Sequence, residues 1–306
     1  MYDYIIMLDK VSKENFEGEI FKTLYLKVKD TSKTYSKADE IKNDKWVDEL
    51  TKAGLKDVLV FVHGYNEEKN DILKRHRKIK AGLKKNGYTG EVVTFNWPCG
   101  NNVLNYLDDR HEAKQTALRL ATDCISILAK QQQSGCTANI HLLAHSTGAY
   151  VVREAFNDAD DMKVTSEVNW KVSQVMFISG DVSSNSMRPG DDGQAIYDHC
   201  VRFTNYFNPF DVVLGVSNVK RLGIENRVGR VGLTNDVPAK CVDVNCGNLY
   251  DKKYRDKKNE LYSHSWYFDD SVFMKDMFDT IQGSIDRNYI PTRKRLVDND
   301  LELKIS

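Results

Sequence analysis

The stretch NIHLLAHSTGAYVV, residues 139–152, places a serine between an apolar run and a run of helix-forming residues. The apolar run ends at Ala144 and the helix formers resume at Ala149, so Ser146 falls in a tight turn from strand to helix. Such a turn presses strand against helix, and the residues two before and two after the serine must be small, as Ala144 and Gly148 are. Glycine is more common at the first of these positions. The context of strand and helix predicts a nucleophile elbow at Ser146 rather than a polar loop with a chance match.

Outward from this turn, short runs rich in Val, Ile, Phe and Leu alternate with longer amphipathic stretches. The alternation favours an α/β fold in which helices cover a mostly parallel sheet. The run at residues 58–62 is apolar throughout, as expected for a central strand buried on both faces. We expect strands at residues 4–8, 23–28, 58–62, 91–95, 139–144, 173–178, 201–206 and 240–244, with the first two antiparallel, and helices at residues 72–86, 105–130, 149–157 and 271–285.

Length and composition indicate one compact domain. The chain has 306 residues, of which 41% are hydrophobic, and no internal repeat or linker divides it. We expect N-terminal strands and a connection at residues 1–50, a catalytic core at residues 51–290 and a C-terminal tail at residues 291–306. The interval at residues 180–200 is too short for a large cap domain.

Charge and cysteine usage exclude several classes of protein. Lys+Arg and Asp+Glu each number 44, so no net charge favours nucleic acid as a partner. No apolar run approaches the roughly 20 residues that span a bilayer. The N-terminus carries Asp3 and lacks the pattern of a signal peptide, so we expect a cytoplasmic location, although a chain trimmed of its leader would look the same.

The six cysteines lack zinc-like spacing, so we interpret them as free thiols, and we expect no metal or organic cofactor.

An oxyanion site is expected beside the elbow. One backbone N–H should come from the residue after the nucleophile, Thr147. The second should come from the loop after the strand at residues 58–62, which reads His63-Gly64-Tyr65-Asn66, and we assign it to Tyr65. The glycine allows close approach of the backbone. His63 could serve as a base, but a role in holding this loop by hydrogen bonds is favoured, and the same holds for His145.

A serine nucleophile needs a base and a carboxylate, which in this arrangement follow it in the order serine, acid, histidine. Only His199 and His264 follow Ser146. His264 is favoured because it lies between the last expected strand and the last helix, whereas His199 precedes a strand and so lies at the opposite end of the sheet. For the acid, Asp211 follows the strand at residues 201–206 and is favoured over Asp181, which follows the preceding strand.

Five segments in order now resemble a known family: VLVFVHGYN, TFNWPCGNNVLNYLDD, HLLAHSTGAYVV, FISGDVSS and NYFNPFDVVLGVSN. The chain is similar, over residues 58–217, to a poorly characterised bacterial family of esterase-like serine hydrolases in the α/β-hydrolase superfamily. Its members read HGYN, a Trp-Pro-Ser segment followed by Tyr and Asp, AHSMGN, PDID and SxNDxAL. Departures are Cys99, Thr147, Ala149 and Gly180, none of which removes a catalytic group.

The resemblance implies an α/β-hydrolase fold with Ser146 as nucleophile and Asp211 at the acid position. It also implies that His63, Gly64, Tyr65 and Asn66 form the oxyanion loop. It carries least weight for His264, which lies beyond the similar segment.

The sequence as a whole therefore predicts a serine hydrolase that cleaves an ester, thioester or amide of a small-molecule substrate. Trp97 and the loop that follows it are expected to shape the acyl pocket, although packing is an equal reading. A non-catalytic protein of the same fold that binds a ligand or partner is the alternative. The physiological substrate and the oligomeric state are left open.

Overall fold

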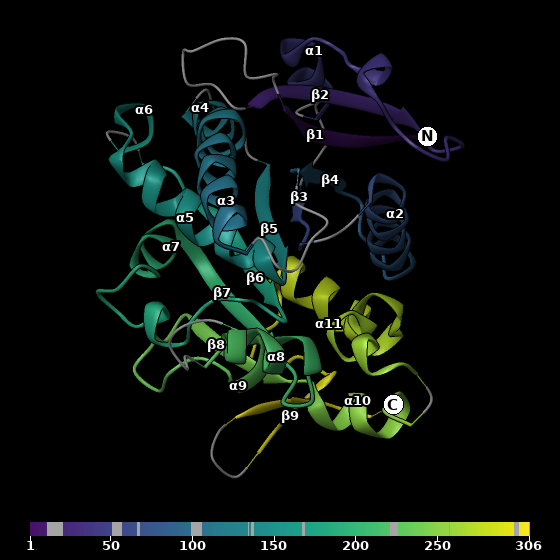
Figure 1. Ribbon diagram of the computed structural model, residues 1–306, viewed down its shortest axis with the longest axis vertical. Helices are drawn as coiled ribbons and strands as arrows, with labels where there is room; N and C mark the ends of the chain where they lie inside the picture. The colour runs from purple at the N-terminus through teal and green to yellow at the C-terminus, as the bar shows by residue number, and fades with distance from the viewer. Residues whose placement is uncertain are drawn as a thin grey trace.

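The computed structural model describes residues 1–10, 21–50, 57–65, 68–98, 106–133, 135, 138–166, 169–220, 226–256, 258–296 and 300–305 (Figure 1). Within these residues the strands form a single ten-stranded sheet in the order β2-β1-β4-β3-β5-β6-β7-β8-β10-β9. Neighbouring strands are parallel except at the two edges, where β2 and β9 run antiparallel to their neighbours. The strands are β1 (Tyr2–Lys10), β2 (Phe21–Lys29), β3 (Asp57–Val62), β4 (Glu91–Asn96), β5 (Asn139–His145), β6 (Val172–Ile178), β7 (Cys200–Phe207), β8 (Cys241–Asn245), β9 (Arg293–Arg295) and β10 (Leu301–Leu303).

Helices cover both faces of this sheet (Figure 1). The α-helices are α1 (Asn43–Leu50), α2 (Lys69–Lys85), α3 (Tyr106–Leu120), α4 (Ser126–Gln133), α5 (Thr147–Asp161), α6 (Lys163–Ser166), α7 (Gln194–His199), α8 (Val212–Lys220), α9 (Val228–Val231), α10 (Gly247–Lys253) and α11 (Ser271–Gln282). Short 3₁₀ segments are η1 (Lys37–Asp39), η3 (Asn185–Met187), η4 (Glu260–His264) and η5 (Trp266–Asp269), and η2 (Ala121–Ile125) is a π-turn. The expected fold, a mostly parallel sheet flanked by helices, is confirmed.

The alternation of side chains along β3 explains why a large hydrophobic cluster lies on each face of the sheet. Every residue of β3 is buried, and its successive side chains point to opposite faces. Val58, Val60 and Val62 belong to the cluster that includes α3 and α5, whereas Leu59 and Phe61 belong to the cluster that includes α2 and α11. The apolar run of β3 is therefore explained by helices on both sides.

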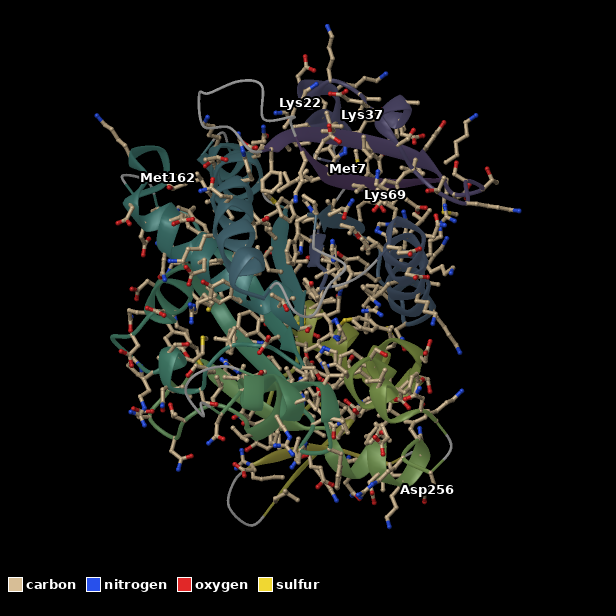
Figure 2. The ribbon with its side chains drawn as sticks, viewed as in Figure 1. Met7, Lys22, Lys37, Lys69, Met162 and Asp256 are labelled. Carbon is tan, nitrogen blue, oxygen red and sulfur yellow. The ribbon has the colours of Figure 1, made fainter. Side chains whose placement is uncertain are left out.

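Toward the β2 edge of the sheet, the central residues of β1 and β2 are still buried on both faces. Met7 on β1 is 2% exposed and packs with a small third cluster under this edge. Lys22 and Lys37 of the same region are exposed at the surface (Figure 2). No helix among the described residues is long and apolar enough to cross a bilayer.

The parallel register brings the carboxyl ends of the central strands to one edge of the sheet. Val62 at the end of β3 lies opposite Ala144 of β5, and His145 lies opposite Ile178 of β6. Ile178 in turn lies opposite Tyr206 of β7. The segments that follow these strands are therefore neighbours, which is where ligands bind in open α/β sheets.

Two expectations about the elements differ from the structure. The helix expected at residues 105–130 is divided by η2, where the Ser126 hydroxyl donates to the Ala121 carbonyl (2.8 Å). Residues 291–306, expected to form a tail, supply β9 and β10 at the edge of the sheet. Three-residue strands are too short to show a period of two, so the sequence carries no signal for them.

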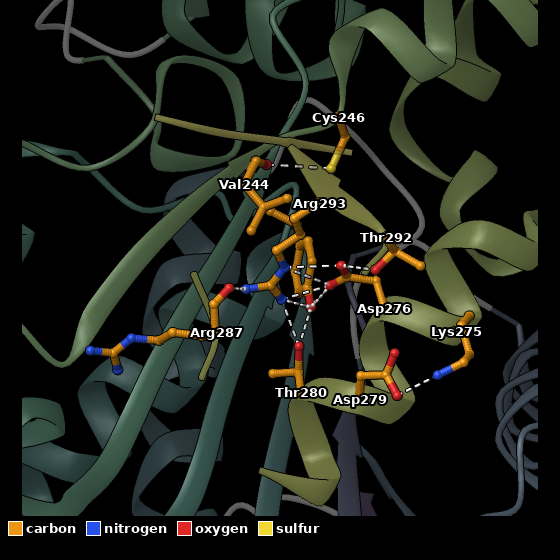
Figure 3. A network of polar contacts seen from close by, with 10 residues as sticks. Val244, Cys246, Lys275, Asp276, Asp279, Thr280, Arg287, Thr292 and Arg293 are labelled. Carbon is orange, nitrogen blue, oxygen red and sulfur yellow. Dashed lines mark hydrogen bonds and ion pairs between the residues drawn. The ribbon is translucent and has the colours of Figure 1, made fainter. Parts of the chain in front are cut away.

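A buried ion pair ties β9 to the rest of the fold (Figure 3). Arg293 on β9 donates from two guanidinium nitrogens to Asp276 on α11 (2.6 and 2.9 Å), and neither side chain is exposed. The Tyr206 hydroxyl on β7 donates to the same carboxylate (2.8 Å), and Thr280 accepts from Arg293 (2.6 Å). One network thus joins β7, α11 and β9.

Loss of one partner from this network leaves a buried charge uncompensated. We expect Arg293→Ala to lower the free energy of unfolding by about 3 to 5 kcal/mol, measured by urea denaturation. Lys294→Ala on the same strand is the matched control. The Lys294 side chain, which pairs with Glu302, is 43% exposed, so loss of this ion pair should cost under about 1 kcal/mol. Equal effects of the two substitutions would contradict this account.

Candidate active site

Ser146 lies in a strained turn at the tip of β5. Its backbone has φ 56° and ψ −127°, and among the described residues only Ser146 and Ser179 combine a side chain with a positive φ. The Ser146 N–H donates to the Ile178 carbonyl (3.1 Å), which holds the turn against β6. Such a conformation persists only where the surroundings enforce it.

Two glycines make the turn possible. A Cβ on Gly148 would lie 2.4 Å from the Val62 carbonyl oxygen and 2.6 Å from that of His63, so no side chain fits at the start of α5. A Cβ on Gly64 would lie 2.7 Å from the Cβ of Ser146. The loop after β3 therefore packs directly against the serine, which is the placement that an oxyanion loop requires.

His264 and Asp211 form a buried pair. The His264 Nδ1–H donates to Asp211 Oδ2 (2.7 Å), and the Asp211 side chain is completely buried. The other carboxylate oxygen accepts the N–H of Leu214 in the first turn of α8 (3.0 Å). Both oxygens of Asp211 are thus held, and the proton of the imidazole is directed to Nδ1, which leaves Nε2 as an acceptor.

The segment that carries His264 is fixed to the end of β7 by two further bonds. The Asn208 side-chain amide donates to the Ser263 carbonyl (2.9 Å), and the Val212 N–H donates to the Ser263 hydroxyl (3.1 Å). These contacts hold η4 against the turn that bears Asp211. The sequence between β8 and α11 gave no signal for them.

His145 connects the elbow to His264. Its Nε2–H donates to the His264 carbonyl (2.8 Å), and its Nδ1 accepts from the Arg75 guanidinium (3.3 Å). The rings of His145 and His264 lie 4.7 Å apart between centroids. Burial lowers the pKa of His145 well below its usual value, and the neighbouring His264 and Arg75 lower it further, so the ring is neutral. Sequence analysis missed Arg75, which comes from the middle of α2.

Ser146 is 8% exposed. Among the described residues, the structure records no hydrogen bond between the Ser146 hydroxyl and His264. In the absence of substrate such contacts are often long, and they shorten when the complex forms.

His63 holds the loop after β3. The Trp97 N–H donates to His63 Nε2 (3.2 Å), and His63 Nδ1–H donates to the Gly64 carbonyl (2.7 Å). The Trp97 indole N–H donates to the His63 carbonyl (3.0 Å), and the two rings stack. Trp97 is 2% exposed and packs on His63.

The alternative acid and base have other partners. Asp181 Oδ1 lies 3.3 Å from the Nε of Arg227. His199 Nε2 lies 2.6 Å from Asp160, and its ring stacks on Trp170 before the amino end of β7. Among the described residues, neither the Asp181 carboxylate nor the His199 ring is hydrogen-bonded to His264 or Asp211.

The remaining expected residues are placed only in part. Thr147 is the first residue of α5, where helical N–H groups lack an intrahelical acceptor. Tyr65 directly follows Gly64 and is half-buried, whereas Asn66 lies outside the described residues. No group of three or more His, Cys, Asp or Glu side chains in the described part of the chain could hold a metal ion.

Solved structures with a similar arrangement have low identity to this chain. Lipase B of Aspergillus fumigatus is 17% identical, with a TM-score of 0.36 over 61% of this chain and 45% of that one. A cutinase-like protein of Cryptococcus sp. is 13% identical, with a TM-score of 0.36 over 73% and 91%. A protein of Agrobacterium vitis S4, whose assignment as a hydrolase is provisional, is 8% identical, with a TM-score of 0.44 over 94% and 100%.

Sequence comparisons give the family. An uncharacterized protein of Nostoc sp. is 29% identical over 125 residues, and the match covers 34% of this chain and only 32% of that protein. Residues 39–241, more than half of the chain, match the family model described as an alpha/beta hydrolase of unknown function (DUF900). With its mostly parallel sheet and flanking helices, the chain belongs to this family of alpha/beta hydrolases.

Proposed function

We propose that this protein is a serine hydrolase that cleaves a carboxylic ester or a related acyl bond through an acyl-enzyme intermediate. One observation carries the proposal: the buried hydrogen bond between His264 and Asp211 lies beside a strained turn that presents Ser146. Nucleophile, base and orienting acid are the three groups that acyl transfer by serine needs.

In the first step, His264 Nε2 takes the proton of the Ser146 hydroxyl while the oxygen attacks the substrate carbonyl. The hydrogen bond from Nδ1 to Asp211 fixes the tautomer that makes Nε2 a base, and the carboxylate stabilises the imidazolium that forms. His145 holds the backbone of His264 by its own hydrogen bond, so it acts as a positioning residue.

The tetrahedral intermediate carries a negative oxygen that needs donors. We assign these to the backbone N–H groups of Thr147 and Tyr65, each worth about 3 to 4 kcal/mol in such sites. Their support is the position of Thr147 at the start of α5 and the contact distance between Gly64 and Ser146. His63 and Trp97 keep the loop in place.

Collapse of the intermediate breaks the acyl bond, and the proton on His264 passes to the leaving group. Water then attacks the acyl-enzyme and gives a proton to His264. His264 passes this proton to the Ser146 oxygen as the bond to the acyl group breaks, which restores the serine hydroxyl and releases the acid product. No step requires a metal or an organic cofactor. The described cysteines Cys124, Cys200, Cys241 and Cys246 are free and buried, which favours a reducing compartment such as the cytoplasm as the place of action.

Reaction with a fluorophosphonate tests the nucleophile. We expect stoichiometric labelling of the wild-type protein, detected by mass spectrometry, and no labelling of Ser146→Ala. Ser179→Ala is the matched control because Ser179 is also a serine with positive φ at the end of a central strand, and it should still be labelled. A folded wild-type protein that stays unlabelled would favour the non-catalytic binding protein instead.

The neutral state of His145 predicts a dependence of stability on pH. The unfolded chain binds a proton at His145 near pH 6.5, whereas the folded chain resists it, so stability falls as pH drops below this value. In His145→Gln, which retains an amide donor, this contribution is absent. As the pH is lowered from about 7.5 to about 5, the free energy of unfolding of the variant should therefore rise relative to that of the wild type. A constant difference across this range, measured by urea denaturation, would show that the ring is not held neutral.

A further inference from the structure

A polar cavity of about 320 Å³ lies beside the elbow, and the catalytic steps above do not use it. We call it the α5 cavity, because Tyr150 and Arg153 of α5 form one wall. Asp181 and Ser183, from the segment after β6, and Arg227, just before α9, form the opposite side. Its size is at the lower end of ligand pockets, so it suits a small group rather than a long chain.

The α5 cavity adjoins the residue that bears the proposed nucleophile. The backbone N–H of Asp181 donates to the Ser146 carbonyl (3.0 Å), so one wall of the cavity is hydrogen-bonded to the nucleophile residue. Along α5, Tyr150 and Arg153 lie four and seven residues beyond Ser146, a rise of about 6 and about 10 Å. The cavity therefore lies along the first two turns of α5, next to the serine turn.

Two side chains that line the cavity carry buried polar atoms without a hydrogen-bond partner among the described residues. Arg153 is 5% exposed and donates to the Ser186 hydroxyl (2.7 Å), while Asp192 lies 3.2 Å from its guanidinium. Its Nε and the hydroxyl of Ser183, which is 6% exposed, are both buried without a hydrogen-bond partner among the described residues. Buried polar groups of this kind are normally satisfied, so a polar ligand or water is expected there.

The charges of the lining define the class of ligand. Two guanidinium groups, Arg153 and Arg227, face three carboxylates, Asp181, Asp191 and Asp192, so the lining carries a net charge of −1. Both guanidinium groups are already paired with carboxylates of the lining. An anion such as phosphate or a carboxylate is therefore disfavoured, and the polar lining disfavours an acyl chain.

We propose that the α5 cavity binds a neutral, polyhydroxylated group of the substrate, such as a sugar or another polyol. Vicinal hydroxyls both donate and accept, which matches a lining of carboxylates, guanidinium groups and a serine hydroxyl. Combined with the proposed function, on which this assignment of substrate rests, the enzyme acts on acyl esters of hydroxyl-rich compounds.

Ligand binding by the catalytically inactive Ser146→Ala protein tests the cavity without turnover. By NMR titration, we expect saturable binding of glucose or glycerol, and weaker or no binding of cyclohexanol and inorganic phosphate. Ser183→Ala should weaken polyol binding about three- to tenfold, and Arg153→Met should weaken it more. Ser173→Ala is the matched control because Ser173 bonds to Asn139 at the opposite end of β6, and it should bind as tightly as the parent.

A parallel arm measures kcat/KM for a glucose acetate and for cyclohexylmethyl acetate. We expect a preference of about 100-fold or more for the sugar ester, which declines in Ser183→Ala. Preferential binding of phosphate or cyclohexanol, or no saturable binding of either polyol, would overturn the assignment of the cavity. Polyol binding without fluorophosphonate labelling would refute the proposed function alone, and labelling without polyol binding would refute the cavity alone.

Discussion

The close approach of three backbone segments at Ser146 determines the geometry of the site. The turn from β5 to α5 holds the serine at φ 56°, a strained conformation that costs of order 1 to 3 kcal/mol. It persists because Gly148 lets α5 pass close to the carbonyls at the end of β3, and because Gly64 lets the following loop touch the serine side chain. Ser146 and the loop after β3 are therefore brought together by contacts of the backbone, and their spacing does not depend on flexible side chains.

His264, the proposed base, reaches this turn from far along the chain. His264 lies more than a hundred residues after Ser146, yet its carbonyl accepts a hydrogen bond from His145, and its ring is paired with Asp211 at the end of β7. Segments that follow three different strands thus meet around one imidazole. The network of Arg293 and Asp276 joins β7, α11 and β9 elsewhere in the fold, and it stabilises the half of the sheet from which Asp211 and His264 come.

Much of this could be predicted from the sequence, because the signals are local. The apolar run of β3 and the small residues around Ser146 are visible in short stretches of sequence. The order serine, acid, histidine is visible along the chain. What could not be predicted depends on contacts distant in sequence. In the sequence, Arg75 on α2 gives no sign that it faces His145. Nor does the sequence show that Asp211 pairs with His264 whereas Asp181 pairs with Arg227. The α5 cavity likewise assembles from segments whose polar residues look like ordinary surface.

The central claim is that Ser146, His264 and Asp211 act as one unit, and the non-additivity of their substitutions tests it most directly. On p-nitrophenyl acetate, His264→Ala should lower kcat by about 10⁴-fold or more, and Asp211→Asn should lower it by about 10⁴-fold. The double variant should be no slower than His264→Ala alone, and His199→Ala should stay near wild type. Losses that multiply in the double variant, or a loss that follows His199 instead, would contradict the account.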